Sequence, residues 1–263
     1  MDLGLMGKKA LVCGASRGIG RAIAEGLAHE GVELVLCARQ DAALAKAAED
    51  IRQKTGARIH FRTCNLTEPD ERNTLIAAVK DFVGDVDILV HNTGGPRPSS
   101  AQETTLDDWK SGFSQLFEMI VHLNEAFLPK MKEKKWGRIL CITSLSVIEP
   151  IPNLAVSNAM RSAVTSMLKT LSDEVAHFNI TVNCLAPGSI STERLQELME
   201  ARLARTGQSK EEYLKQYIGG IPMGRLGTTE EFASVAVFLA SQKASYVTGS
   251  TIAIDGGKRR STY

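Results

Sequence analysis

Short apolar runs alternate with longer amphipathic segments along this chain of 263 residues, and the alternation limits the possible folds more than any other feature. Several of the short runs are continuously apolar, such as residues 88–90 and 139–142. Runs of this kind are typical of parallel strands that helices cover on both faces. We therefore predict a single-domain α/β fold with a Rossmann-type, doubly wound parallel sheet of about seven strands. The expected strands span residues 9–13, 33–38, 58–64, 87–92, 138–143, 180–186 and 250–255.

The segments between these strands have helical periodicity, and one of them departs from the regular spacing. Residues 191–221 are rich in charge and helix formers and carry Leu195, Leu198, Met199 and Leu203 at helical spacing. Ligands of doubly wound folds bind at the carboxyl ends of the strands, so we expect a helical lid there; a plain surface excursion is the alternative. No repeat or linker divides the chain, which predicts one domain over residues 1–263. The other expected helices span residues 41–54, 69–82, 105–131, 154–178 and 229–240.

The composition argues against several classes of function. The chain has 31 Lys and Arg residues against 30 Asp and Glu, so no net field favours nucleic acid or an anionic membrane. The basic residues 258–260 are interpreted as a solvated tail. No stretch approaches the roughly 20 apolar residues of a membrane span, and the N-terminus has no basic region followed by an apolar one. We therefore expect a cytoplasmic protein without a membrane or nucleic-acid partner.

The five cysteines give no sign of a disulfide framework or a metal site. Each falls in or at the end of a strand-like run, no Cys-x-x-Cys pair occurs, and histidines do not cluster near them. We expect them to be small buried hydrophobes.

The first predicted strand ends in a glycine-rich turn, Gly14-Ala15-Ser16-Arg17-Gly18-Ile19-Gly20, and a helical pattern starts directly after it. Glycine is needed where the backbone turns sharply and lies against a ligand without a Cβ in the way. The N-terminus of the following helix offers free N–H groups to a pyrophosphate. This strand, turn and helix therefore predict a dinucleotide-binding site.

Together with this turn, four further motifs resemble the short-chain dehydrogenase/reductase family, most closely its β-ketoacyl-[acyl-carrier-protein] reductase-like branch. They are His91-Asn92-Thr93-Gly94, Pro187-Gly188-Ser189-Ile190-Ser191-Thr192, Thr248-Gly249 and Asp255-Gly256-Gly257. The resemblance implies that Asn92, Thr93 and Gly94 lie by the cofactor ribose and that Pro187 to Thr192 hold the nicotinamide carboxamide. Asn65 replaces the aspartate that the family usually places near the adenine, and its amide can still hydrogen-bond to the ring. The implied cofactor-binding residues are Gly14, Ser16, Arg17, Gly18, Ile19, Gly20, Arg39, Asn65, Leu66, Asn92, Thr93, Gly94, Arg161, Pro187, Gly188, Ile190 and Thr192.

The residues after the second predicted strand indicate which dinucleotide binds. An acidic residue there would accept the ribose hydroxyls of NAD, whereas a basic residue would pair with the 2′-phosphate of NADP. Arg39 stands at this position, and Arg17 is the second basic group that NADP-using members of the family tend to carry. Two guanidiniums can hold one phosphate through paired hydrogen bonds. We predict NADP(H), with two solvated surface arginines as the alternative.

The resemblance also implies a catalytic serine, tyrosine, lysine and asparagine, and this chain departs from that set. Alignment places Ser144 at the serine position, Ser157 at the tyrosine position and Arg161 at the lysine position, while Leu116 stands where the asparagine is expected. A serine hydroxyl is far less acidic than a phenol, and arginine does not release its proton. The family's usual mechanism therefore cannot run from these positions.

Another group would then have to supply the proton. Tyr246, in the approach to the last strand, is assigned a structural role, and the lid tyrosines have packing as their alternative role. Tyr263, at the end of the chain, would act in a neighbouring subunit's site. The candidates are His91, Glu149, Tyr213, Tyr217 and Tyr263.

Three functions remain open at this point. The first is an NADP(H)-dependent oxidoreductase that acts on a small-molecule carbonyl or alcohol substrate, with Ser144, Ser157 and Arg161 at its catalytic positions. The second is a catalytically inactive NADP-binding sensor or structural subunit. The third is a non-redox enzyme similar to halohydrin dehalogenases. The resemblance further implies a homotetramer or a homodimer. The helices at 105–131 and 154–178 would pair in a dimer, and the C-terminal strand region would complete a tetramer.

Overall fold

The computed structural model describes residues 1–262, except the side chains of residues 194, 198, 201, 202 and 204–206. Within these residues, seven parallel strands form one sheet in the order β3-β2-β1-β4-β5-β6-β7. This confirms the predicted doubly wound sheet. The order reverses between β1 and β4, which creates the point where such sheets bind ligands. The strands are β1 (Lys9–Cys13), β2 (Glu33–Ala38), β3 (Ile59–Thr63), β4 (Ile88–His91), β5 (Gly137–Ile142), β6 (Ile180–Pro187) and β7 (Thr251–Ile254).

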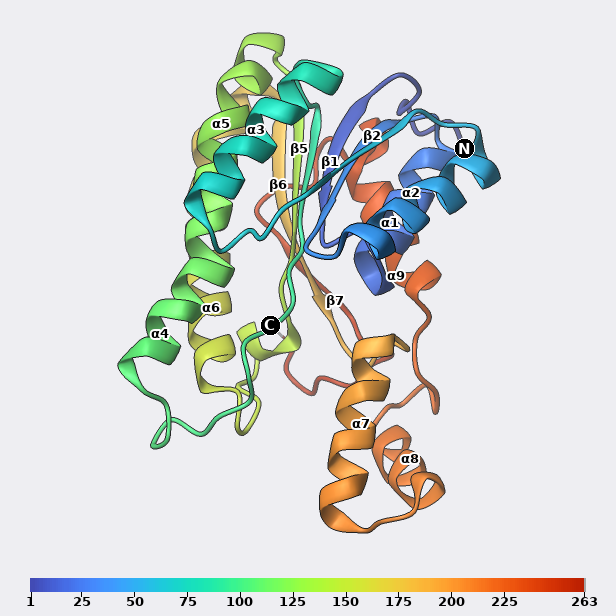
Figure 1. Ribbon diagram of the computed structural model, residues 1–263, viewed down its shortest axis with the longest axis vertical. Coiled ribbons are helices and arrows are strands. Elements are labelled where there is room, and N and C mark those ends of the chain that lie inside the picture. The colour runs from blue at the N-terminus through green and yellow to red at the C-terminus, as the bar shows by residue number, and fades with distance from the viewer. Residues whose placement is uncertain (263) are drawn as a thin grey trace.

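Helices cover both faces of the sheet (Figure 1). One face carries α1 (Gly18–His29), α2 (Asp41–Thr55) and α9 (Thr229–Ala240), and the other carries α3 (Pro69–Val83), α5 (Met119–Lys134) and α6 (Ala155–Val175). The central strands β4 and β5 therefore bury both sets of their side chains, which explains their continuously apolar runs, whereas the edge strands β3 and β7 are only partly buried.

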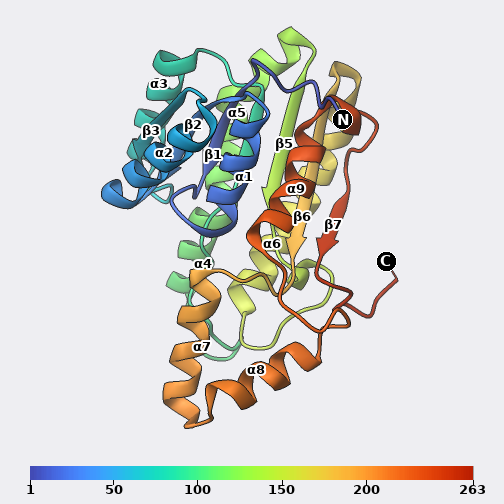
Figure 2. The same cartoon turned by 90° about the vertical axis from the view of Figure 1, so that its right-hand side faces the viewer.

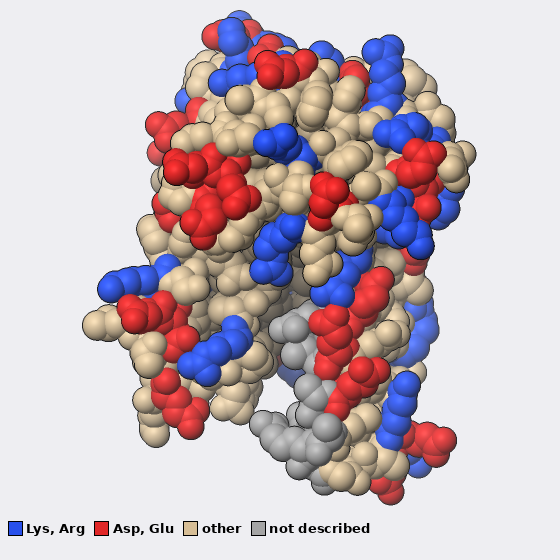
Figure 3. Space-filling view, viewed as in Figure 1, with Lys and Arg blue, Asp and Glu red and all other residues tan. Residues whose placement is uncertain are grey.

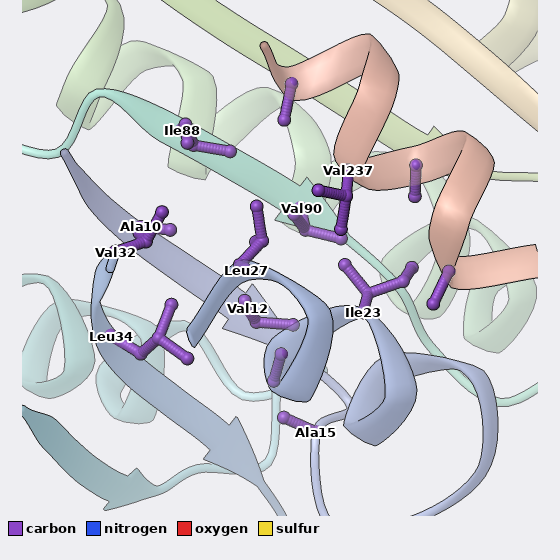
Figure 4. Close-up of a cluster of buried hydrophobic side chains, with 14 of the residues drawn as sticks. Ala10, Val12, Ala15, Ile23, Leu27, Val32, Leu34, Ile88, Val90 and Val237 are labelled. Carbon is purple, nitrogen blue, oxygen red and sulfur yellow. The ribbon is translucent and has the colours of Figure 1, made fainter. Parts of the chain in front are cut away.

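Two hydrophobic cores result, one on each side of the sheet. Val12 packs with Ile23 and Leu27 of α1 in the first core (Figure 4), while its neighbour Leu11 packs in the second. Alternate residues of β1 point to opposite faces, as they must in any strand. Packing on both faces of the sheet thus fixes the end of β1, and with it the position of the glycine turn.

The predicted lid region forms two helices, α7 (Glu193–Thr206) and α8 (Lys210–Gly219). Both lie beyond the carboxyl ends of the strands (Figure 2). Met199 is buried, and Leu195 and Leu203 are partly buried, while the side chain of Leu198 lies outside the described residues. The helical prediction for this region is confirmed.

The helix predicted at residues 105–131 is interrupted, which corrects that prediction. It consists of α4 (Leu106–Phe113), a π-helical turn (Ser114–Glu118) and α5. Contacts with α3 and with the loop before it hold the wide turn: Ser114 Oγ donates to the Thr67 carbonyl at 3.0 Å, and Glu118 Oε1 accepts from buried Arg72 Nη2 of α3 at 2.8 Å. Turns of this kind in helices often lie at functional sites.

The exposure of several further side chains bears on the expectations from the sequence. All five cysteines are free and buried, as predicted. Tyr246, to which we assigned a structural role, is instead fully exposed. Basic and acidic side chains are interspersed over the visible face (Figure 3), which agrees with the near balance of charge. No helix among the described residues is long and apolar enough to cross a membrane.

Candidate active site

The glycine turn between β1 and α1 has no room for larger residues at two of its positions. Gly14 has a φ of +61°, which L-residues with a side chain rarely adopt. A Cβ added to Gly20 would lie 2.2 Å from the Gly14 carbonyl oxygen. The backbone at Gly20 thus lies directly against the backbone at Gly14, and this geometry requires glycine at both positions.

Asn92 fastens this turn to the neighbouring strand. It follows β4 directly, and its Nδ2 donates to the carbonyls of Cys13 and Gly14, both at 3.3 Å. The resemblance assigned Asn92 to the cofactor ribose, whereas its amide nitrogen serves here to hold β1 and β4 together at the switch point. Gly94, two residues on, accepts a hydrogen bond from Gln115 Nε2 at 2.9 Å.

The N-terminus of α1 fits a pyrophosphate. The residue that precedes the helix, Arg17, provides no side-chain acceptor for the first-turn N–H groups, and no acidic residue lies in that first turn. The N–H groups of the first turn, together with the positive end of the helix dipole, favour an anion. Gly18, Ile19 and Gly20 form the start of this helix.

The two arginines predicted to bind the 2′-phosphate have different surroundings. Arg39 is exposed directly after β2. Arg17 Nη1 donates to Glu197 Oε1 of α7 at 2.6 Å, in an ion pair whose side chains are about half exposed. The lid thus contacts the glycine turn through a residue that the sequence analysis did not single out.

Asn65, assigned to the adenine, and the implied cofactor-binding residue Leu66 lie after β3. Asn65 Oδ1 accepts a hydrogen bond from Thr67 Oγ1 at 3.0 Å, which leaves its amide nitrogen as the group suited to a ring acceptor. Leu66 is buried, and its carbonyl accepts from Arg72 Nη1 at 2.9 Å. The turn that carries Asn65 is therefore anchored to the core.

The loop after β6 is held at both ends. Gly188 N donates to the Ile254 carbonyl at 3.0 Å, and a Cβ on Gly188 would lie 2.6 Å from Asp255. Ile190 is buried, and Thr192 Oγ1 accepts from Leu195 N at 3.2 Å and so caps α7. Thr192 therefore connects the loop after Pro187 to the lid.

Two of the three predicted catalytic residues contact each other. Arg161 Nε donates to the buried Ser157 Oγ at 3.3 Å, and Arg161 Nη1 donates to the Ile142 carbonyl at 3.0 Å. Burial lowers the pKa of the Arg161 guanidinium, but an arginine has such a high ordinary pKa that it keeps its charge. Ser144, two residues beyond Ile142, accepts from Ser146 N at 3.1 Å.

A small cavity of about 10 Å³ lies beside Arg161, large enough for about one water molecule. Arg161, Thr143, Leu116 and His91 are among its lining residues. His91 Nε2 lies 2.9 Å from Asn124 Oδ1, and within the described residues His91 Nδ1 has no hydrogen-bond partner. The cavity is therefore polar on one side.

The surroundings of His91 and Glu149 argue against both as proton donors. Burial lowers the pKa of His91 from 6.5 to about 4, so the imidazole is neutral near pH 7. Glu149 was a candidate only if burial raised its pKa, and its side chain is exposed. Tyr263 lies outside the described residues. The lid tyrosines remain: their rings stack 5.7 Å apart, and the Tyr217 hydroxyl is 3.1 Å from Ser189 Oγ.

His91 predicts a distinct dependence of stability on pH. The unfolded chain takes up a proton at this residue near pH 6.5, but the folded protein does so only near pH 4. Between these values the unfolded state binds more protons, so stability falls as the pH is lowered. We expect a loss of about 3 kcal/mol at pH 4 relative to pH 7 from this residue alone.

Urea unfolding of the wild type and of His91→Asn from pH 4 to 8 checks this expectation. Asparagine cannot take up a proton, so the difference in unfolding free energy between the two proteins should change with pH only below about 6.5. A difference that stays constant across the range would contradict the assigned neutral, buried imidazole.

The parallel sheet, the glycine turn at its switch point and the helix that starts directly after this turn define the doubly wound class of dinucleotide-binding proteins. A family model described as "Enoyl-(Acyl carrier protein) reductase" matches residues 14–259. The chain belongs to the short-chain dehydrogenase/reductase family, as the resemblance of its motifs predicted.

Curated relatives match over almost the whole chain. The NADPH-dependent reductase BacG of Bacillus subtilis is 33% identical over 97% of this chain and 98% of its own length. The 3-oxoacyl-[acyl-carrier-protein] reductase FabG of Haemophilus influenzae is 34% identical, over 96% of this chain and 98% of its own.

Solved structures of this family share the fold. L-Sorbose reductase from Gluconobacter frateurii, complexed with NADPH and L-sorbose, gives a TM-score of 0.95 at 32% identity and covers 99% of this chain and 100% of its own. The second structure is an NADPH-bound short-chain oxidoreductase from Pseudomonas aeruginosa, described as containing an atypical catalytic center. It gives a TM-score of 0.87 at 30% identity and covers 97% of this chain and 98% of its own.

Proposed function

We propose that this chain is an NADP(H)-dependent oxidoreductase, similar to 3-oxoacyl-[acyl-carrier-protein] reductases, that acts on a carbonyl or hydroxyl group through a nonstandard catalytic site. The observation that carries the proposal is the intact glycine turn and helix N-terminus, which fit a pyrophosphate. The relative BacG is an NADPH-dependent reductase, which supports both the cofactor and the reaction class.

The proposed cofactor contacts follow from the described positions. Gly14 to Gly20 would hold the pyrophosphate, and Arg39 with Arg17 the 2′-phosphate. Asn65 would bind the adenine, and the loop from Pro187 to Thr192 would bind the nicotinamide carboxamide. When bound, NADPH supplies the hydride for reduction of the substrate.

The proposed roles of Ser144, Ser157 and Arg161 are to bind and polarise the substrate oxygen. Reduction of a carbonyl builds negative charge on that oxygen, and fixed donors and cations stabilise such charge. Arg161 brings a permanent charge, already oriented by its bonds to Ser157 Oγ and the Ile142 carbonyl. Because arginine does not release a proton, this group of residues stabilises an oxyanion but does not protonate it.

The atypical centre of the Pseudomonas aeruginosa relative supports the view that members of this family can depart from the usual catalytic set. We further propose one NADP-binding domain over residues 1–263, a cytoplasmic location, and a homotetramer or homodimer that pairs through α5 and α6. Light scattering of the purified protein measures the oligomeric state directly.

Fluorescence titration with NADPH, followed by a turnover screen on ketones, aldehydes and the corresponding alcohols, tests the proposed function. We expect saturable NADPH binding and oxidation of NADPH with at least one carbonyl substrate. Binding without turnover across the whole screen would instead favour the inactive sensor or structural subunit. Absence of NADPH binding would contradict both.

A further inference from the structure

Three side chains from distant parts of the sequence meet at the lid. Ser189 lies in the loop after β6, Tyr217 on α8, and Lys258 beyond β7. Lys258 Nζ donates to Ser189 Oγ at 2.9 Å, and Ser189 Oγ lies 3.1 Å from the Tyr217 hydroxyl. Lys258 Nζ also lies 4.7 Å from the centre of the Tyr217 ring. We call these three residues the lid triad.

The lid triad corrects the expectation for residues 258–260. We interpreted them as a solvated tail, but Lys258 is partly buried and bonded to Ser189, which is only 5% exposed. A long cationic side chain loses conformational freedom and hydration when it is buried, so a specific partner is needed to hold it there. Ser189 and the Tyr217 ring provide that partner.

We propose that Tyr217 donates the proton to the substrate oxygen, and that Ser189 and Lys258 replenish it. The inference rests on the proposed reductase function, whose site around Ser157 and Arg161 contains no suitable acid. The lid triad supplies a phenol, a hydroxyl and an ammonium in one connected chain. The Tyr217 hydroxyl contacts the loop expected to hold the nicotinamide.

The directions of the hydrogen bonds suit this role. An ammonium has donors and no acceptor, so Ser189 Oγ must accept from Lys258. Ser189 keeps one hydrogen of its own, which it can direct to the Tyr217 oxygen at 3.1 Å. The phenol hydrogen of Tyr217 is then left for the substrate.

The charges around the lid triad favour the transfer. A cation near a phenol stabilises the phenolate that remains when the proton has left. Burial lowers the pKa of the Lys258 ammonium, while the carboxylate of Asp255 acts in the opposite direction and raises it. Tyr213, another titratable residue of α8, stacks on the Tyr217 ring. Lys258 therefore carries a proton that it releases more readily than an exposed lysine.

The position of the lid triad is compatible with contact to the substrate. The lid helices lie at the carboxyl ends of the strands (Figure 2), where doubly wound sheets bind their ligands. Ser189 sits between Gly188 and Ile190, both predicted to contact the cofactor. A phenol bonded to Ser189 is thus next to the loop that would hold the nicotinamide, and a small closing motion of the lid would bring it to the substrate.

The proton and electron balance is simple. Hydride adds to the carbonyl carbon, the C=O π pair moves to oxygen, and that oxygen takes the phenol proton of Tyr217 to give the alcohol. Ser189 then passes its proton to the phenolate and receives one from Lys258. Water returns the last proton to Lys258, so the net reaction consumes one carbonyl, one NADPH and one proton.

Tyr217→Phe tests the proposal, with Tyr246→Phe as the matched control because Tyr246 is fully exposed. We expect Tyr217→Phe to lower kcat for a carbonyl substrate by about 100-fold or more, the usual contribution of a general acid. NADPH affinity and the urea midpoint should stay within error of the wild type. Unchanged kcat in Tyr217→Phe would overturn the proposal.

The relay gives a second measurement, made on the protein without cofactor. NMR with ¹³C-labelled lysines follows the titration of Lys258, assigned from Lys258→Met. We expect Ser189→Ala to lower the pKa of Lys258 further, because the mutation removes an acceptor that favours the charged form. An unchanged titration of Lys258 would disprove the relay.

These measurements separate the two proposals. Wild-type protein that binds NADPH but turns over no substrate contradicts the proposed function itself. Turnover of a carbonyl that is equally fast in the wild type and in Tyr217→Phe contradicts only the assignment of Tyr217. Loss of kcat in Tyr217→Phe with NADPH affinity retained supports both.

Discussion

Replacing Arg39 with aspartate is expected to raise the Kd for NADPH by about 100-fold, the largest effect on binding that we predict. A charge-assisted hydrogen bond is worth roughly 1.5–3 kcal/mol, and the new carboxylate also repels the 2′-phosphate. Arg39 is exposed after β2, so the substitution disturbs no buried contact. The same carboxylate can accept the ribose hydroxyls of NADH, so the Kd for NADH should fall.

Fluorescence titration of the wild type, Arg39→Asp and Arg39→Gln with both cofactors measures this change in preference. The glutamine variant removes the positive charge without adding a negative one and should lie between the other two. An equal loss of affinity for NADPH and NADH would mean that Arg39 does not contact the phosphate that distinguishes them.

The ion pair between Arg17 and Glu197 allows the proposed contact of Arg17 with the 2′-phosphate to be tested separately from that of Arg39. Glu197 Oε1 lies 2.6 Å from Arg17 Nη1, so a phosphate must compete with this carboxylate for the guanidinium. Exposed pairs of this kind contribute at most about 1 kcal/mol. Glu197→Gln is therefore expected to tighten NADPH binding by no more than about fivefold, and to leave NADH binding unchanged.

The central part of the sheet was predictable from the sequence because strands such as β4 and β5 are buried on both faces. That double burial imposes continuous apolar runs, such as residues 139–142, which lie within β5. The interruption after Phe113 was not predictable in the same way. The contact between Arg72 and Glu118 that holds the π-helical turn joins residues 46 apart in sequence, and local periodicity contains no information about such a contact.

The same distinction applies to the candidate site. The glycine turn is contiguous, so its constraints are visible in its own residues, and the structure places Gly14 and Gly20 in direct backbone contact. The lid triad joins residues 28 and 69 positions apart. Lys258 was therefore misread as part of a solvated tail, because its partner Ser189 becomes its neighbour only in the folded sheet.

Introducing the family's usual pair, Ser157→Tyr with Arg161→Lys, is expected to restore reduction in protein that lacks Tyr217. Ser157 and Arg161 are four residues apart on α6 and already bonded to each other, so the new phenol and ammonium would be neighbours. General acid catalysis contributes about 100-fold or more. We expect kcat/KM of Tyr217→Phe to rise by about that factor with the pair added.

In protein that retains Tyr217, the same pair should add little, because one proton donor already suffices. The matched control is Ser157→Phe with Arg161→Lys, which fills similar space without a hydroxyl and should restore nothing. A large gain from the tyrosine pair in the wild-type background would show that the native protein lacks an effective acid, which contradicts the role of Tyr217. A gain confined to the Tyr217→Phe background would show that two phenols, one on α6 and one on α8, can protonate the same substrate oxygen.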